Sequence, residues 1–271
     1  MLFNLITSLT TRCSPYLRHM GYLDEAMAMR NRFRQRQAAW QPHLNSSRQF
    51  ILAAAKRCPD RNKVVILGSG LLLDVPLHEL SSQFREVILM DVICLPETRK
   101  QISSCPNAVF VEHDLTGLSE QLYRHKLQGR ADLPGIEAAA PAHCGNADLV
   151  VSLNILSQLW VIPRGYAIDR PPRADPEQLD DWCSGMVAAH YSFLRGLPCP
   201  VCLIADHAFV KRDREDRVIS SGSSVYDLAL PEPDASWKWN IAPLGSESGF
   251  YSKELRVGAW RNISTVLRNG A

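Results

Sequence analysis

Short apolar runs, separated by segments with helical periodicity, dominate the middle of the chain. These runs cover residues 64–67, 86–91, 108–112, 147–153 and 201–205. Each is nearly continuous in its apolar character rather than alternating, which is typical of strands buried on both faces. The pattern therefore predicts an α/β domain whose parallel sheet is covered by helices on both sides.

The pattern changes after the fifth run. Residues 236–242 and 255–260 alternate between apolar and polar positions, and Pro243, Gly245 and Gly249 lie between them. Alternation on both sides of a turn-rich segment predicts an antiparallel strand pair. Together with the five runs, this pair predicts a seven-stranded, mostly parallel sheet that is closed by two antiparallel strands.

The first 57 residues contain helical periodicity and no strand pattern. We expect them to form a helical extension (1–57) that could fold over the main domain (58–271) as a lid. Pro42 is predicted to break this helical segment, with Asn45 or Ser46 capping the helix that follows. The alternating arginines at positions 30, 32, 34 and 36 are interpreted as a solvated helix surface rather than a phosphate-binding patch.

Composition and charge give no sign of a nucleic-acid or membrane partner. The chain has 271 residues, is 46% hydrophobic and carries a formal charge of +2, so nothing in the overall charge indicates nucleic acid as a partner. The N-terminus lacks the features of a signal peptide, and no apolar run reaches the length of a membrane span, so we expect a cytoplasmic protein without stable membrane insertion. The oligomeric state cannot be deduced. Cys199 and Cys202 are interpreted as structural thiols, and no metal site is predicted.

A glycine turn follows the first apolar run, at Gly68-Ser69-Gly70. A buried strand that leads into such a turn and a helix can bind a nucleotide-like ligand, because backbone N–H groups are open to it. The next helix is predicted over 75–84. Asp74 before it is either the helix N-cap or a polar ligand contact.

Polar residues follow the next three apolar runs. Asp91 ends the second run, Asp114 follows the third and Asn154 follows the fourth. Ligands of open parallel sheets bind beyond the carboxyl ends of the strands, so these side chains and the glycine turn are expected to share one site. An ionised carboxylate there can accept from both hydroxyls of a ribose.

With these residues in place, the chain resembles the class I S-adenosylmethionine-dependent methyltransferases, over roughly residues 60 to 262. The resemblance implies a Rossmann-like fold and S-adenosyl-L-methionine as cofactor. It also implies that Gly68, Ser69 and Gly70 carry the methionine part, and that Asp91 holds the ribose hydroxyls. Two positions depart from the family pattern, because Ile66 and Leu72 stand where an acid and a third glycine are frequent.

The resemblance implies further contacts. Val92 and Leu115 would pack on the adenine, and Asp114 would contact its amino group. Asn154 would line the methyl-transfer site, and Asp74 could replace the contact that the missing acid usually provides.

Candidate catalytic residues are few. Methyl transfer requires an aligned acceptor, with or without a base that removes one proton. His113, Asn154 and His207 are the candidates, and Asp206 beside His207 is another potential base. His43 would reach the site only if the N-terminal helices cover it.

The reaction is predicted to be methyl transfer to a small molecule whose identity the sequence does not reveal. Two alternatives stay open. A nicotinamide-dependent oxidoreductase fits Gly68, Gly70 and Asp91 in part, although Leu73 occupies its third glycine position. A non-catalytic binding protein with the same fold is the other, because a fold does not fix a function.

Overall fold

A mixed sheet forms the centre of the computed structural model, which describes residues 2–137 and 140–266. In the described residues the sheet has eight strands, and its order is β3-β2-β1-β4-β5-β8-β7, with β6 paired to β5. The strands are β1 (Lys63–Leu67), β2 (Glu86–Asp91), β3 (Ala108–Glu112), β4 (Leu149–Leu153), β5 (Val201–Arg212), β6 (Val218–Ser223), β7 (Ala235–Ala242) and β8 (Ser252–Trp260).

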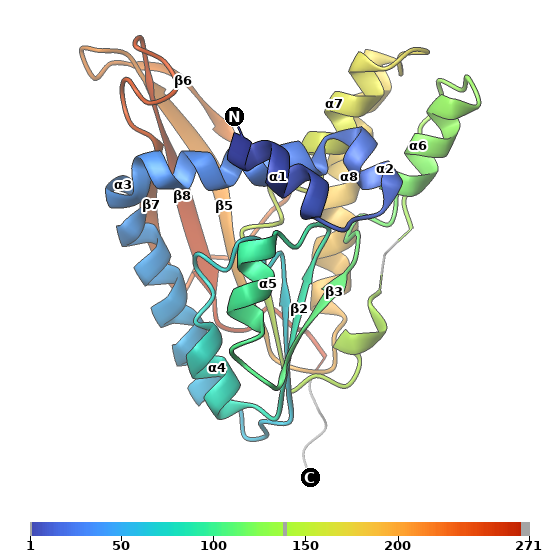
Figure 1. Ribbon diagram of the computed structural model, residues 1–271. Helices are drawn as coiled ribbons and strands as arrows, with labels where there is room; N and C mark the ends of the chain where they lie inside the picture. Colours follow the sequence, from blue (N-terminus) through green and yellow to red (C-terminus); the bar gives the residue numbers. More distant parts are fainter. Residues whose placement is uncertain (1, 138–139, 267–271) are drawn as a thin grey trace.

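The strand directions confirm the predicted fold class. Strands β1 to β5 pair in parallel, and β8 pairs with β5 and β7 in antiparallel fashion, so the parallel strands are closed by an antiparallel pair. The fold is Rossmann-like and has a helical N-terminal segment (Figure 1). Strand β6 was not predicted; all of its residues are exposed, so it has no hydrophobic pattern to reveal it.

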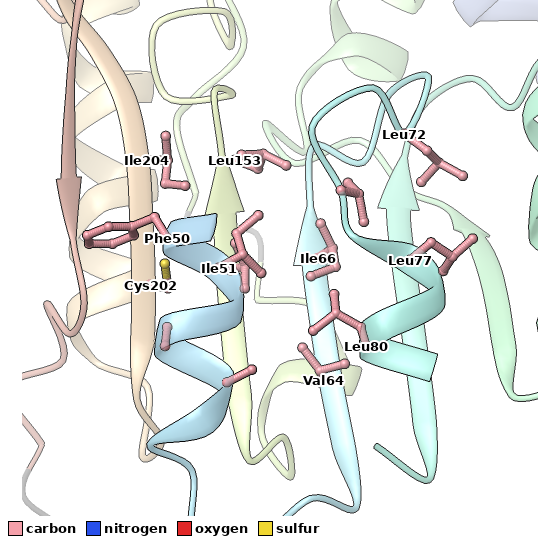
Figure 2. Packing of buried hydrophobic residues seen from close by; sticks show 14 of the residues in the cluster. Phe50, Ile51, Val64, Ile66, Leu72, Leu77, Leu80, Leu153, Cys202 and Ile204 are labelled. Atoms are coloured by element: carbon pink, nitrogen blue, oxygen red, sulfur yellow. The ribbon is translucent and has the colours of Figure 1, made fainter. Parts of the chain in front are cut away.

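Helices cover both faces of the sheet (Figure 1). Their bounds are α1 (Leu2–Thr10), α2 (Pro15–Met20), α3 (Tyr22–Lys56), α4 (Leu77–Gln83), α5 (Pro96–Ile102), α6 (Ser119–Leu127), α7 (Val161–Asp169) and α8 (Pro176–Arg195), with a 3₁₀ turn at Ala142–Cys144. On one face the second half of α3 and α4 bury a single cluster against the strands, as Figure 2 shows for Ile51, Ile66 and Leu80. On the other face α8 contributes Val187 and Leu194 to a second cluster.

The long helix α3 contradicts the predicted break at Pro42. The helix runs from Tyr22 to Lys56 through the proline, and its only non-helical backbone angles lie earlier, at Arg36 (φ −123°, ψ 19°). Asn45 and Ser46 therefore cap nothing. Packing explains the difference: Trp40, His43 and Leu44 around the proline are all buried, which offsets the hydrogen bond that the proline removes.

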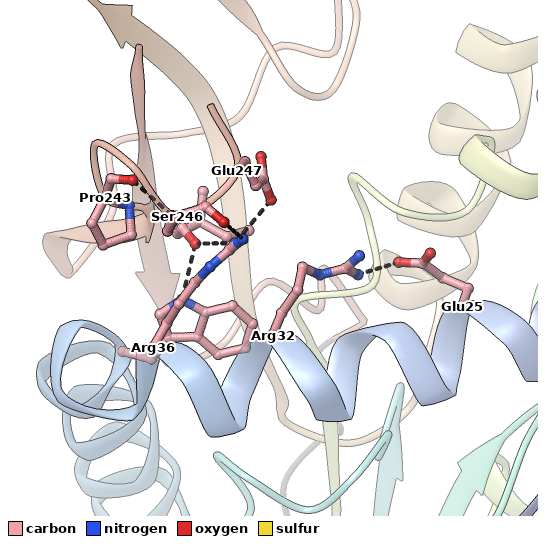
Figure 3. Close-up of polar contacts among 8 residues, drawn as sticks. Glu25, Arg32, Arg36, Pro243, Ser246 and Glu247 are labelled. Atoms are coloured by element: carbon pink, nitrogen blue, oxygen red, sulfur yellow. Dashed lines mark hydrogen bonds and ion pairs between the residues drawn. The ribbon is translucent and has the colours of Figure 1, made fainter. Parts of the chain in front are cut away.

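Two of the four clustered arginines also contradict the prediction of a solvated surface. Arg30 is 4% exposed and pairs with Glu97 on α5 at 2.9 Å. Arg36 is 5% exposed, and its guanidinium donates to the carbonyls of Ile241 and Ser246 and to a Glu247 carboxylate oxygen, each at 2.8 to 3.0 Å. Figure 3 shows Arg36 joined to the loop between β7 and β8, with Arg32 paired to Glu25 along α3.

The cysteine pair Cys199-Pro-Val-Cys202 is divided between the two faces. Cys199 is buried in the α8 cluster, and Cys202 is buried in the α3 cluster, so both thiols are core residues. Burial raises the pKa of Cys202, which keeps it in the unreactive thiol form. Among the helices of the described residues, none is both long and apolar enough to cross a membrane.

Candidate functional site

The glycine turn after β1 is held by the neighbouring strand. The amides of Gly68 and Ser69 donate to the Met90 carbonyl at 3.0 and 3.1 Å, and the Gly70 amide donates to the Asp91 carboxylate at 2.7 Å. Both glycines have positive φ, at 79° and 49°, a conformation that costs other residues free energy. A Cβ at Gly68 would lie 2.8 Å from Ile155, whereas a Cβ at Gly70 would meet open space.

Asp74 is not a helix cap, which corrects one of the two interpretations of this residue. Helix α4 begins at Leu77 rather than at Val75. The Asp74 carboxylate instead accepts a hydrogen bond at 2.7 Å from the side-chain amide of Asn154, which follows β4. Burial raises the pKa of Asp74, and the hydrogen bond from Asn154 opposes that rise.

His43 on α3 reaches this pair. Its Nδ1 accepts the Trp237 indole N–H at 3.0 Å, so the neutral ring carries its proton on Nε2. The Nε2 atom lies 3.2 Å from the Asn154 amide nitrogen and 3.9 Å from the Asp74 carboxylate. The ring stacks on Trp239 at 4.0 Å, and burial lowers the pKa of His43 to about 3. His43 can contact Asn154 and Asp74 because α3 lies across this end of the sheet (Figure 1).

A cavity of about 580 Å³ opens beyond the carboxyl ends of the strands. Its lining includes the glycine turn together with Asp74, Asp91 and Asn154, and thereby joins residues that lie far apart in the sequence. A smaller hollow adjoins it and shares Asp91, Ile155 and Gln158 with its lining. Asp91 therefore borders both spaces.

The smaller hollow contains the remaining predicted cofactor residues and the catalytic candidate His113. Val92, His113, Asp114 and Leu115 all line it. The Asp114 carboxylate accepts from the Thr116 amide and hydroxyl and from the Ser119 amide, at 2.7 to 2.9 Å, so it fixes the turn before α6. Burial lowers the pKa of His113, which favours its neutral form.

A buried acid of β5 lines the large cavity next to a β-bulge. Strand β5 continues to Arg212, so Asp206 and His207 lie within the strand and not after its end. The pairing with β8 skips His207, and the skipped residue lets both Asp206 and Phe209 line the cavity. The Asp206 carboxylate is 2% exposed and accepts the Ser157 hydroxyl at 2.5 Å.

His207 lies apart from this cavity. It lines a separate groove together with Pro231, Lys238 and Arg256, and it is absent from the lining of both spaces that Asp91 borders. The alternation along β8 separates the two locations, because Leu255 packs in the α3 cluster whereas Arg256 lines the groove. Of the three predicted catalytic residues, only Asn154 lines the large cavity, and His113 lines the smaller one.

Several lining residues were not predicted from sequence. Glu25, Met29 and Arg32 come from the first half of α3, and Trp40 and Trp239 form an aromatic wall at 5.3 Å between ring centres. These residues lie on an N-terminal helix and on the last hairpin, outside the strand-end motif. The alternating pattern around Trp239 was the only sequence signal for any of them.

Unpartnered polar atoms gather around the two spaces. Ser69 Oγ, Asn154 Oδ1 and Trp239 Nε1 are buried with no hydrogen-bond partner among the described residues, and all three residues line the large cavity. His113 Nε2, at the smaller hollow, is also buried without a hydrogen-bond partner among the described residues. Native proteins rarely leave buried polar atoms unpaired, so their concentration here indicates a polar ligand.

Comparison with known proteins gives a limited result. No protein-family profile and no curated protein matches the chain. Among solved structures, a complex of DhpI with SAM and HEP has 13% identity and a TM-score of 0.38, covering 90% of this chain and 99% of that one. The N-methyltransferase NodS from Bradyrhizobium japonicum, solved with S-adenosylhomocysteine, has 11% identity and a TM-score of 0.35, covering 79% and 85%.

A third solved structure is the Burkholderia thailandensis 1,6-didemethyltoxoflavin-N1-methyltransferase with 1,6-didemethyltoxoflavin and S-adenosylhomocysteine. It has 11% identity and a TM-score of 0.33, and the match covers 88% of this chain and 90% of that one. At such scores and identities these likenesses decide nothing about the chemistry of this chain, which has to be inferred from its own residues.

Proposed function

We propose that the chain binds S-adenosyl-L-methionine and transfers its methyl group to a small molecule. The observation that carries the proposal is that two neighbouring spaces share Asp91 in their linings. Asp91 lies between the cavity that contains the glycine turn and the hollow lined by Val92 and Leu115. Such an arrangement suits a cofactor with a ribose between an apolar base and a charged amino acid.

The residues present fit the three parts of this cofactor. Gly70 leaves open space where a side chain would stand, and Ser69 Oγ and Asn154 Oδ1 are unpartnered beside it, which suits the methionine end. Asp91 would accept from the ribose hydroxyls in addition to its bonds from the Gly70 and Val92 amides. The apolar side chains of Val92 and Leu115 would contact the adenine.

The Asp114 carboxylate has little acceptor capacity left for the adenine contact. Its carboxylate already accepts three hydrogen bonds within its own turn. A carboxylate offers about four acceptor positions, so one position is left for the adenine amino group. Asp74 would face the methionine ammonium group, and the bound cofactor would supply an electrophilic methyl group.

The acceptor would occupy the rest of the large cavity. Its volume of about 580 Å³ lies within the usual range for small-ligand sites, roughly 300 to 1,000 Å³. Its outer wall comes from α3 and the β7–β8 hairpin, through Met29, Trp40 and Trp239. A wall of this kind supports a small acceptor and the predicted lid role of the N-terminal helices.

Calorimetry with S-adenosylmethionine and its demethylated product S-adenosylhomocysteine tests the proposal. Wild type should bind both, and Asp91→Asn should lose at least tenfold in affinity, because an amide cannot accept from two hydroxyls and the Gly70 amide together. Asp148→Asn is the matched control. Its carboxylate also accepts hydrogen bonds from two backbone amides, those of Asn62 at 2.7 Å and Lys63 at 2.9 Å. These two residues lie at the start of β1, away from the cavity.

The outcomes separate the competing functions. Binding of reduced nicotinamide dinucleotide in place of S-adenosylmethionine would favour the oxidoreductase alternative. Absence of binding by all three compounds would contradict the cofactor proposal. Equal losses in Asp91→Asn and Asp148→Asn would show that the loss reflects general destabilisation and would remove Asp91 from the site.

A further inference from the structure

Asp206 is the most deeply buried carboxylate of the large cavity, and it accepts hydrogen bonds from two serines of other segments. Ser157 Oγ donates to its Oδ1 at 2.5 Å, and the Gln158 side-chain amide donates to Ser157 Oγ at 3.0 Å. The Ser224 hydroxyl interacts with the carboxylate as well. Asp206 continues the alternation of Cys202 and Ile204, which face the α3 cluster, and the bulge at His207 brings Phe209 to the same side. Bulges of this kind are common beside active sites.

The charged surroundings of Asp206 come from several elements. Lys253 on β8 is the cation whose field acts on it, and it also lies 5.5 Å from the centre of the Phe209 ring. The other ionisable groups that line the cavity are Glu25, Arg32, Asp74, Asp91 and Glu247. Burial outweighs the neighbouring donors and raises the pKa of Asp206 to about 6, which is a suitable value for a group that takes up a proton near neutrality.

We propose that Asp206 is the proton acceptor of the reaction and that the methyl acceptor is a hydroxyl or amine carried on a flat apolar body. This inference rests on the proposed function. As the acceptor's oxygen or nitrogen forms its bond to the methyl carbon, the bond from that carbon to the cofactor's sulfur breaks and its electron pair stays on sulfur. The proton of the acceptor passes to the Asp206 carboxylate and then to solvent.

The flat apolar body follows from the walls beside Asp206. Phe209, Trp40, Trp160 and Trp239 are aromatic, and Leu44, Ile241 and Leu255 are among the other apolar residues of the lining. The unpartnered Trp239 indole N–H gives the wall one further hydrogen-bond donor. Aromatic surfaces favour planar apolar ligands, whereas the carboxylate requires one protic group at a defined position.

A pair of probes that differ only in the protic group provides the test. We would measure the affinities of 7-hydroxycoumarin and 7-methoxycoumarin by calorimetry, with S-adenosylhomocysteine bound, on either side of the Asp206 pKa, at about pH 7 and about pH 5. Wild type should prefer the hydroxyl compound about tenfold at the higher pH, because a hydrogen bond to an ionised acceptor is strong. The preference should disappear at the lower pH, at which Asp206 is mainly protonated.

Three variants test whether Asp206 causes the preference for the hydroxyl compound. Asp206→Asn should show little preference at either pH, whereas Asp216→Asn, in the exposed turn between β5 and β6, should behave as wild type. Ser157→Ala keeps the carboxylate but removes a donor that lowers the pKa of Asp206, so the preference should disappear at a higher pH than in wild type. This second variant covers the case in which Asp206→Asn does not fold.

The results that would overturn the inference are distinct from failure of the proposed function. Equal affinities of the two coumarins for wild type, no binding of either, or a preference that persists in Asp206→Asn would each contradict it while S-adenosylhomocysteine still binds. Loss of S-adenosylhomocysteine binding by wild type would overturn the proposed function itself, and the role of Asp206 with it.

Discussion

The Asp91 carboxylate lies 2.7 Å from the Gly70 amide nitrogen, so the last residue of β2 holds the turn that follows β1. Its other oxygen accepts the Val92 amide at 2.8 Å, which fixes the carboxylate between the two strands. A ligand that contacts Asp91 therefore contacts a group whose position is set by the sheet itself. The site is built on the rigid centre of the fold, and the residues that enclose it come from α3 and the β7–β8 hairpin.

The two glycines of the turn should respond differently to substitution by alanine. Both have positive φ, which costs an alanine about 1 kcal/mol or more. At Gly68 the new Cβ would also lie 2.8 Å from Ile155 Cβ and from the Leu153 carbonyl oxygen, which adds overpacking and brings the loss of unfolding free energy to about 3 kcal/mol.

Gly70→Ala is the matched control for this substitution, because its Cβ meets nothing within 4 Å. It should lose about 1 kcal/mol, from backbone strain alone. Urea unfolding of both variants measures the difference. Equal losses would show that the close approach of Ile155 to the turn does not constrain this position.

Apolar runs made the parallel strands predictable, because buried strands must be continuously apolar whatever surrounds them. Strands β2 and β3 begin and end at the predicted residues. The expected burial on both faces is wrong for β3, which is an edge strand without a buried residue. Strand β6 could not be found this way, since its pairing with β5 depends on backbone hydrogen bonds and buries no side chain. The bulge at His207 was equally hidden, because it depends on how β5 pairs with β8, a strand distant in the sequence.

Tertiary contacts also explain the failures in the N-terminal helices. Pro42 removes only a local hydrogen bond, and no local pattern reveals that Trp40 and His43 pack against β7. The strand-end acids could be predicted because topology alone brings them together. The aromatic wall could not, and the approach of His43 could be predicted only conditionally, because both depend on how α3 crosses the sheet.

Replacing Arg36 should destabilise the wall of the cavity strongly. Its guanidinium joins the kink of α3 to the β7–β8 loop through two carbonyls and Glu247 (Figure 3). Arg36→Ala leaves these acceptors without their buried donor, and we expect a loss of about 3 kcal/mol in unfolding free energy. Arg124→Ala removes an exposed pair with Glu120 and should cost less than about 1 kcal/mol. Chemical denaturation would contradict this role of Arg36 if the two variants lost the same amount.

His43 should make stability fall as the pH is lowered. Its folded pKa of about 3 lies below the ordinary value of 6.5, so the unfolded chain binds a proton that the folded chain excludes. Between pH 7 and pH 5 this histidine should account for a loss of about 2 kcal/mol.

His43→Gln tests this contribution, because glutamine can still accept the Trp237 N–H but does not titrate. The difference in unfolding free energy between the two pH values should shrink by about 2 kcal/mol in the variant. His190, whose folded pKa is also lowered, is left intact, so its own contribution should persist. An unchanged pH dependence would mean that the pKa of His43 is not lowered in the folded protein.

Asp74 should matter for the methionine end of the cofactor and not for its nucleoside. Its carboxylate lines the large cavity, is held by Asn154 at 2.7 Å and is absent from the lining of the smaller hollow. Asp74→Asn removes the negative charge that would face the ammonium group. S-adenosylhomocysteine should therefore bind about tenfold more weakly, which corresponds to about 1.4 kcal/mol, whereas adenosine should bind as it does to wild type. Calorimetry with both ligands separates the two ends: equal losses for both would mean that Asp74 shapes the turn as a whole, and no loss for either would remove it from the site.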